Sequence, residues 1–296
     1  MSSRTIEVRH FEGFQGLELT ADAGGDPSHT PIVLMHGGGQ TRRSWGTATT
    51  ALIARGYYVV SVDLRGHGES GWPQDADYSL DAFVLDLCAL LKALPRPAVL
   101  VGASLGGIIG LLAVGEQRRQ AAGLVLVDIA PEMDRQGAAN ISGFMSAYPD
   151  GFATVEEAAG AVSAYLPHRP KPKDTSGLRK NLRVGDDGRF YWHWDPRLAQ
   201  QSRARMANMT YRMNQAAPHV TVPTLLVRGE HSELVSEAAV ASFRALLPAA
   251  EYVDVKGARH MVAGDENSLF NQAVLDFLAR HIPSTPRPAN TLHPGG

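Results

Sequence analysis

Apolar runs of strand length alternate along this chain with longer amphipathic stretches, and this alternation constrains the fold more than any other feature. The strand-like runs lie at residues 32–35, 57–62, 98–101, 124–127, 224–227 and 252–255. Helices are expected at residues 45–55, 80–93, 105–120, 236–247 and 266–281. Because the short runs are apolar on both faces, they fit buried strands of a parallel sheet that helices cover. The sequence therefore predicts an α/β fold with a mostly parallel sheet, helices on both faces and an antiparallel hairpin (residues 5–11 and 17–20) at the edge.

The alternation stops between residues 131 and 216. This interval is rich in Ala, Met and Arg and contains a proline-laden loop at residues 167–173. A helical insertion after the sixth strand fits these features, and in an open α/β sheet it would cover the carboxyl ends of the strands. We therefore expect a core of residues 1–130 and 217–284, a helical lid of residues 131–216 and a disordered tail of residues 285–296.

A serine flanked by glycines, Gly102-Ala103-Ser104-Leu105-Gly106, separates one strand-like run from a helical stretch of small residues. A sharp turn from strand to helix would expose this serine and strain its backbone, and side chains at Gly102 and Gly106 would collide with their neighbours. Ser104 is therefore the candidate nucleophile of covalent acyl chemistry. A plain small-residue loop beside a helix is the alternative interpretation.

Nucleophilic serine catalysis needs a base and backbone donors for the oxyanion of the tetrahedral intermediate. His260 follows the last strand-like run and precedes the last helix, so we expect this base at the same sheet edge as Ser104. The loop of residues 36–39 (HGGG) ends the first parallel strand, and its glycines let the backbone approach a substrate closely. The N–H groups of Gly38 and Leu105 are the expected oxyanion donors.

With these motifs in this order, the chain resembles the α/β-hydrolase superfamily, in its branch of lidded serine carboxylesterases. The resemblance extends to Trp45 after the glycines and to residues 63–70 (DLRGHGES), 223–229 (PTLLVRG) and 257–260 (GARH). It covers the core on both sides of the insertion. It implies that residues 63–70 form a tight structural loop in spite of their charges.

The triad acid departs from the commonest pattern of this family, in which an aspartate follows the strand expected at residues 224–227. Ser232 occupies that place here, and Glu233 comes next. Either Glu233 supplies the acid, or the acid lies on Asp128, at the end of the preceding strand. We favour Asp128, because one helix and one strand after Ser104 would bring its carboxylate to the same sheet edge.

These residues predict hydrolysis of carboxylic esters of small to medium, rather apolar molecules through an acyl-enzyme on Ser104. Lactonase, perhydrolase (cofactor-free and haloperoxidase-like) and carbon–carbon bond hydrolase activities use the same kind of triad and stay open. A non-catalytic ligand receptor on the same fold is the alternative from another class. The chemistry requires no cofactor and no metal.

The aromatic and methionine side chains of the insertion are candidates for the wall of an apolar pocket, although each could equally join the lid to the sheet. The residues expected to contact substrate are Gly37, Gly39, Trp192, Trp194 and Met261.

The composition of the chain limits the kinds of molecule that it is expected to bind. The net charge of -2 comes from interspersed signs, which argues against nucleic acid and anionic membrane surfaces and favours a small-molecule ester. Cys88 is the only cysteine, so no intramolecular disulfide can form. The first residues lack the apolar core of a secretory signal, and no apolar stretch is long enough to span a membrane. We expect a cytoplasmic monomer or homodimer.

Overall fold

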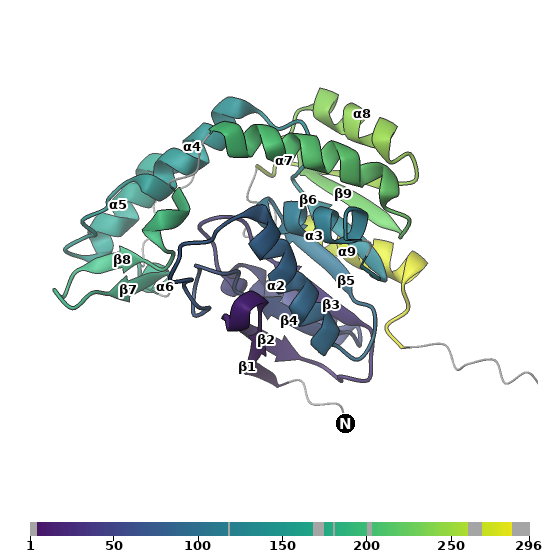
Figure 1. Ribbon diagram of the computed structural model, residues 1–296, viewed down its shortest axis with the longest axis horizontal. Helices are drawn as coiled ribbons and strands as arrows, with labels where there is room; N and C mark the ends of the chain where they lie inside the picture. Colours follow the sequence, from purple (N-terminus) through teal and green to yellow (C-terminus); the bar gives the residue numbers. More distant parts are fainter. Residues whose placement is uncertain are drawn as a thin grey trace, which may run out of the picture.

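An eight-stranded sheet forms the centre of the protein (Figure 1). The computed structural model describes residues 5–117, 119–167, 175–179, 181–199, 203–259 and 268–285. The strands of the sheet are β1 (Ile6–Glu12), β2 (Glu18–Gly24), β3 (Pro31–Met35), β4 (Tyr58–Val62), β5 (Val99–Ala103), β6 (Gly123–Val127), β9 (Thr224–Gly229) and β10 (Glu251–Val255). Their order is β1-β2-β4-β3-β5-β6-β9-β10, with antiparallel pairing at β1–β2 and β2–β4 and parallel pairing elsewhere. The predicted α/β fold is confirmed.

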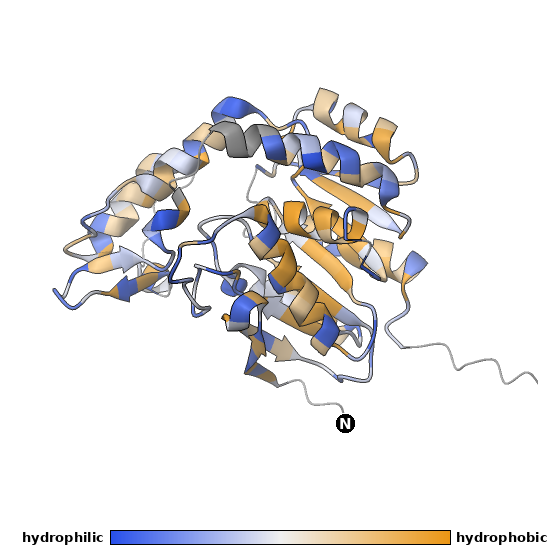
Figure 2. Ribbon diagram, viewed as in Figure 1, coloured by the Kyte–Doolittle hydropathy of each residue, from blue (hydrophilic) through white to orange (hydrophobic). Residues whose placement is uncertain are grey.

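Helices cover both faces of the sheet and bury two apolar clusters. One cluster holds α2 (Leu80–Ala93), α3 (Leu105–Gly115) and α8 (Glu237–Leu246), and the other holds α1 (Gly46–Ala54) and α9 (Ser268–His281). Successive residues of β3 alternate between the two clusters. Each central strand therefore buries both of its faces, and Figure 2 shows the hydrophobic colouring concentrated in these strands and in α3.

The chain between β6 and β9 leaves the sheet and forms an inserted segment, residues 128–223. Its elements are α4 (Arg135–Ser146), α5 (Val155–Tyr165), α6 (Ser176–Arg179), β7 (Leu182–Val184), β8 (Phe190–Trp192), η3 (Pro196–Ala199), α7 (Arg203–Ala216) and η4 (Ala217–His219). The segment is mostly helical, as predicted, but the antiparallel hairpin of β7 and β8 was not expected. Strands of three residues are too short to produce a readable hydrophobic period.

The connection from β8 to η3 ties the inserted segment to the loop after β4. The Gly68 N–H donates to Nδ1 of His193 at 3.0 Å, and the Asp195 N–H donates to the Gly66 carbonyl at 2.8 Å. The Tyr78 hydroxyl donates to Oδ2 of Asp195 at 2.5 Å. Because His193 and Asp195 are buried, these bonds are protected from competing water, and they hold the segment over the carboxyl ends of the strands.

A second tie joins α7 to the helices below it. The Arg212 guanidinium donates to both carboxylate oxygens of Glu116, at 2.9 and 2.6 Å, and lies 2.7 Å from a carboxylate oxygen of Asp81. The bidentate geometry favours a defined orientation of α7 on α2 and α3.

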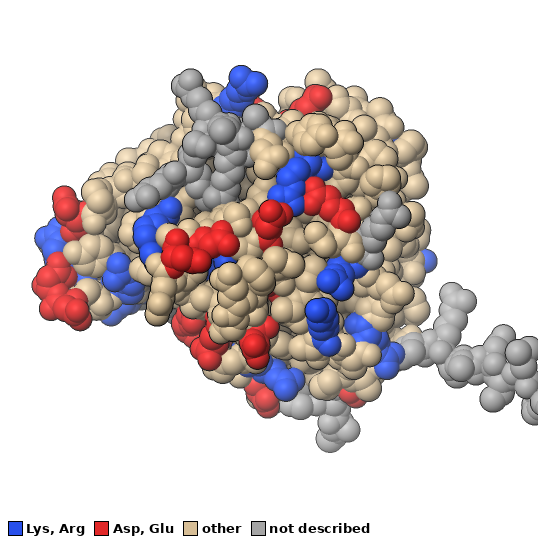
Figure 3. Space-filling model, in the orientation of Figure 1, with Lys and Arg blue, Asp and Glu red and all other residues tan. Residues whose placement is uncertain are grey.

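Positive and negative side chains are interspersed on the face seen in Figure 3, among the residues drawn in colour. Such a mixture gives little long-range attraction for a polyanion on this face. None of the helices in the described ranges has both the length and the apolar character needed to cross a bilayer.

The buried His193, which joins the inserted segment to the loop after β4, predicts that the stability of the fold depends on pH. Burial lowers the pKa of His193 to about 4, an effect that His36 reinforces and Asp63 opposes. Histidine in the unfolded chain has a pKa of about 6.5, so between pH 6.5 and 4 the unfolded state binds a proton that the folded state does not. The free energy of unfolding therefore falls as the pH falls through this window.

In His193→Asn the amide oxygen can replace Nδ1 as acceptor for the Gly68 N–H, but the proton uptake is lost. We expect the pH dependence of the unfolding free energy to become shallower than in the wild type by about 1.4 kcal/mol per pH unit between those limits. Urea denaturation at a series of pH values measures this difference. Parallel profiles for the two proteins would contradict it.

Candidate active site

Ser104 lies at a sharp turn between β5 and α3. Its backbone has φ 47° and ψ -113°, a combination that non-glycine residues rarely adopt, and its N–H donates to the Val127 carbonyl at 3.1 Å. This bond ties the turn to the end of β6. The serine thus sits in a strained conformation that the surrounding structure maintains, as is typical of functional turns.

The flanking glycines are required by close packing. A Cβ atom at Gly102 would lie 2.3 Å from the backbone of Gly106, and one at Gly106 would lie 2.4 Å from the Met35 carbonyl oxygen. Both obstacles are backbone atoms, which cannot move aside as a flexible side chain can. The N-terminus of α3 therefore approaches β3 and β5 as closely as it does only because these two residues lack side chains.

The glycine loop after β3 leaves one of its backbone donors without an acceptor among the described residues. The Gly37 N–H donates to Oε1 of Gln40 at 3.0 Å, and the Gly39 N–H donates to Nε2 of His67 at 3.2 Å. In the described part of the chain, the N–H groups of Gly38 and Leu105 have no acceptor. Both predicted oxyanion donors are thus unpaired among the described residues.

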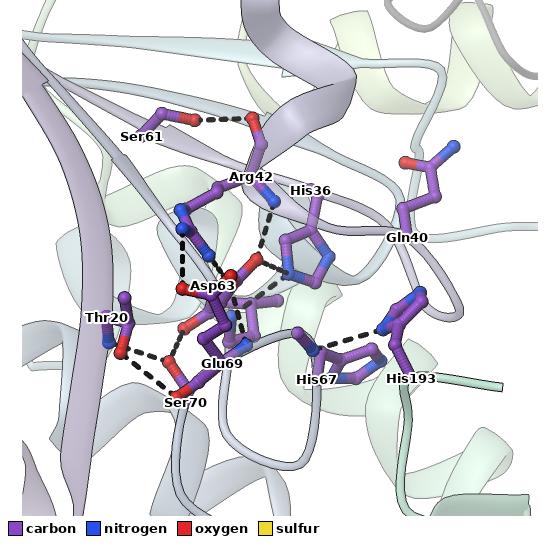
Figure 4. A network of polar contacts seen from close by, with 12 residues as sticks. Thr20, His36, Gln40, Arg42, Ser61, Asp63, His67, Glu69, Ser70 and His193 are labelled. Carbon is purple, nitrogen blue, oxygen red and sulfur yellow. Dashed lines mark hydrogen bonds and ion pairs between the residues drawn. The ribbon is translucent and has the colours of Figure 1, made fainter. Parts of the chain in front are cut away.

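Two buried histidines support this loop as neutral rings (Figure 4). Nε2 of His36 accepts the Leu64 N–H at 3.0 Å while its Nδ1 lies 2.8 Å from the Gly37 carbonyl, and Nδ1 of His67 lies 2.9 Å from the Arg65 carbonyl. Burial lowers the pKa of His36 and lowers that of His67 well below its usual range. A neutral imidazole has one donor and one acceptor, which matches these partners.

Asp63 organises the loop that the resemblance marked as structural (Figure 4). Its fully buried carboxylate accepts the backbone N–H of Arg42 at 2.7 Å and that of Glu69 at 3.0 Å, and it pairs with the Arg42 guanidinium. A Cβ atom at Gly68 would lie 2.1 Å from this carboxylate. Asp63 is thus fully occupied in joining the loop to η2 (Arg42–Trp45).

The two candidate acids have opposite environments. Asp128 directly follows β6, is fully buried, and accepts from the Ser232 hydroxyl at 2.7 Å and from the Gly229 N–H at 3.2 Å. Glu233 has a side chain that is 61% exposed and pairs with Nη1 of Arg259 at 2.5 Å. Only Asp128 combines burial, a position one strand from Ser104 and a fixed orientation.

His260 and Met261 lie outside the described residues, so their predicted roles stay predictions. The chain just before them is described. A Cβ atom at Gly229 would lie 2.5 Å from the Arg259 carbonyl oxygen, and the N–H of the same Gly229 donates to Asp128. The backbone that leads to residue 260 therefore passes beside a partner of Asp128.

A cavity of about 240 Å³ lies between this edge of the sheet and the inserted segment. Ser104, the glycine loop and both predicted tryptophans line it, so the structure brings together the predicted residues Gly37, Gly38, Gly39, Ser104, Trp192 and Trp194. Trp192 and Trp194 stack with ring centroids 5.0 Å apart, and Phe144 stacks on Tyr165 at 4.2 Å. The wall contributed by the inserted segment is thus mainly apolar, with these four aromatic side chains among aliphatic ones.

The sequence did not single out the polar residues of this cavity. Gln40, Thr41 and Ser44 follow the glycine loop, and Asn181 comes from the inserted segment. The sequence feature that could have identified Gln40 and Thr41 is their position directly after three glycines, which places them beside any ligand of that loop.

A parallel sheet with a strained serine at the turn from its central strand into a helix is the architecture of α/β hydrolases. The sequence comparison agrees, because residues 32–273 match the model described as "Alpha/beta hydrolase family". The chain belongs to this family, and it is a hydrolase of the α/β type.

The relatives that this chain matches include a lipase, esterases and other hydrolases. The chain is 30% identical over 270 residues to the sn-1-specific diacylglycerol lipase ABHD11 of Mus musculus, covering 86% of this chain and 83% of the relative. It is 27% identical to Esterase Rv0045c of Mycobacterium tuberculosis, and the match covers 70% of this chain and 68% of that esterase. The crystal structure of E-2-(acetamidomethylene)succinate hydrolase superimposes with a TM-score of 0.81 at 23% identity, over 93% of this chain and all of that one, and shows the shared fold.

The glycine packing at the turn predicts a strong asymmetry between two similar substitutions. Gly102→Ala should lower the free energy of unfolding by about 3 kcal/mol, because the new methyl group meets only backbone atoms. Gly110→Ala, in α3, brings its methyl group 3.3 Å from the flexible end of Leu124, and the higher helix propensity of alanine offsets this contact. Its unfolding free energy should stay within about 1 kcal/mol of the wild type. Urea denaturation of both variants checks this, and equal losses would contradict it.

Proposed function

We propose that this protein is a serine esterase in which Ser104 is the nucleophile, His260 the base and Asp128 the acid. The observation that carries the proposal is the strained Ser104 turn, which borders a cavity together with the glycine loop. The unpaired N–H groups of Gly38 and Leu105 lie on the two segments that meet at this turn.

The reaction follows from these roles. His260 takes the hydroxyl proton as the Ser104 oxygen attacks the ester carbonyl carbon, and the negative charge that develops on the carbonyl oxygen is bound by the Gly38 and Leu105 N–H groups. The intermediate collapses, His260 protonates the departing alcohol, and an acyl-enzyme remains on Ser104. Water, deprotonated by His260, then releases the acid and restores the serine.

Asp128 is proposed as the acid because a buried, oriented carboxylate best holds the imidazole in its productive tautomer and stabilises its charged form. The Ser232 hydroxyl and the Gly229 N–H both donate to its carboxylate and fix its orientation. Ser232, which occupies the family's usual acid position, donates to Asp128 instead of supplying a charge. The exposed ion pair of Glu233 with Arg259 fits a surface role.

The cavity supports small to medium, uncharged, mainly apolar substrates. In the described part of its lining, no side chain of Asp, Glu, Lys or Arg occurs. Residues 131–216, proposed here as a lid over the core, contribute the apolar wall. An apolar group of the ester would lie against this wall while the ester carbonyl approaches Ser104.

Ser104→Ala tests the nucleophile. We expect kcat for p-nitrophenyl butyrate to fall by at least about 10⁴-fold, since the acyl-enzyme can no longer form, with the unfolding midpoint nearly unchanged. Steady-state kinetics of both purified proteins at saturating substrate concentrations measure kcat. Retention of more than a few per cent of the wild-type rate would overturn the mechanism.

A matched pair of substitutions tests the acid. Asp128→Asn should lower kcat by about 10³-fold to 10⁴-fold, because the amide favours the wrong imidazole tautomer. Glu233→Gln should change kcat by less than about twofold, because it removes an exposed ion pair. The reverse ranking of the two variants would assign the acid to Glu233.

A further inference from the structure

Gln40 is held in one orientation by its own loop. Its Oε1 accepts the Gly37 N–H at 3.0 Å, and its backbone N–H donates to the Gly37 carbonyl at 3.2 Å. Since the Gly37 N–H is a donor, the oxygen of the side-chain amide must face it, and the nitrogen must face the other way. In Figure 4 the amide of Gln40 points away from the His36 and Asp63 network.

The amide nitrogen of Gln40 is left without a protein partner. It carries two N–H donors, and no acceptor for them occurs among the described residues. Gln40 lines the same cavity as Ser104, and a methyl group at Gly37 would lie 3.3 Å from both Oε1 of Gln40 and Cβ of Ser104. The two side chains therefore flank the same glycine, and the free donor belongs to the immediate surroundings of the nucleophile.

Two hydroxyl groups near Gln40 also have no hydrogen-bond partner among the described residues. Thr41 and Ser44 line the cavity, and neither hydroxyl has a hydrogen-bond partner among the described residues, although Thr41 is buried. Polar groups that are removed from water are costly unless a ligand or an ordered water pairs with them. The cavity therefore has a polar side formed by Gln40, Thr41 and Ser44 and an apolar side formed by the inserted segment.

We propose that Gln40 is a specificity-determining residue that donates through Nε2 to an uncharged oxygen of the substrate, close to the reacting ester group. The substrates this favours are neutral esters with an ether, hydroxyl or keto oxygen near the ester carbon and an apolar remainder against the apolar side of the cavity. The inference rests on the proposed esterase function and adds the substrate class. A donor suits such an oxygen, whereas an all-carbon chain leaves the donor unpaired.

The test compares esters that differ only by one oxygen in place of a methylene group. The acyl-side pair is p-nitrophenyl methoxyacetate and p-nitrophenyl butyrate, and the alcohol-side pair is 2-methoxyethyl butyrate and butyl butyrate. For each pair the ratio of kcat/KM, oxygen-containing ester over all-carbon ester, is measured in the wild type and in each variant. Dividing the wild-type ratio by the variant ratio cancels the different intrinsic reactivities of the esters.

Two variants of Gln40 separate recognition from loop support. Gln40→Glu keeps an oxygen to accept the Gly37 N–H but removes the donor, and Gln40→Leu removes both. We expect the ratio for at least one pair to fall by about fivefold or more in both variants, the size of one neutral hydrogen bond. The pair that responds shows whether the oxygen lies on the acyl or the alcohol side. Unchanged ratios for both pairs would overturn the inference.

Asn181→Leu is the matched control, since it removes another carboxamide from the same cavity without touching the glycine loop. Its ratios should match those of the wild type. An equal loss in Asn181→Leu would also overturn the inference, because the preference would then reflect the general polarity of the cavity. Ser104→Ala on all four esters keeps the two proposals apart. If hydrolysis persists in Ser104→Ala, the proposed esterase mechanism is wrong. If hydrolysis depends on Ser104 but the kcat/KM ratios do not change in the Gln40 variants, only the specificity role of Gln40 is wrong.

Discussion

The close approach of the α3 N-terminus to strands β3 and β5 is the constraint on which the site depends. Glycines at 102 and 106 permit contacts of backbone against backbone, and the turn between them strains Ser104 into a positive φ. This arrangement leaves the first N–H groups of α3 without helical acceptors, Leu105 among them. The same packing therefore exposes the serine and supplies a donor beside it.

Hydrogen-bond pairing decides which groups at this edge remain free. Side chains accept two of the three N–H groups of the glycine loop: Gln40, from the same loop, accepts that of Gly37, and the more distant His67 accepts that of Gly39. Asp63 and the neutral histidines are committed to holding loops together. The unpaired groups that a ligand in the cavity can use include the N–H groups of Gly38 and Leu105, the Gln40 amide nitrogen and the hydroxyl groups of Thr41 and Ser44.

Much of the fold was predictable because the strands bury both faces, which produces continuous apolar runs that helices do not share. The serine turn was predictable for a similar reason, since a strained turn under tight packing requires glycines at defined offsets. The β7–β8 hairpin was not predictable, because three-residue strands carry no period. Spacing favoured Asp128 over Glu233 as the acid, but it could not show which of the two is buried, because both follow strands that end at the same edge.

The sequence by itself determined the α/β architecture, the position of Ser104 and the glycine loop, since these depend on local steric requirements and on apolar periodicity. Only the tertiary structure decided which carboxylate is buried, which loop donors are already paired, and that Gln40 faces the cavity with its nitrogen free. Those properties arise from contacts between segments far apart in the chain, such as Asp128 with Ser232. Burial and pairing of this kind leave no pattern in the order of residues.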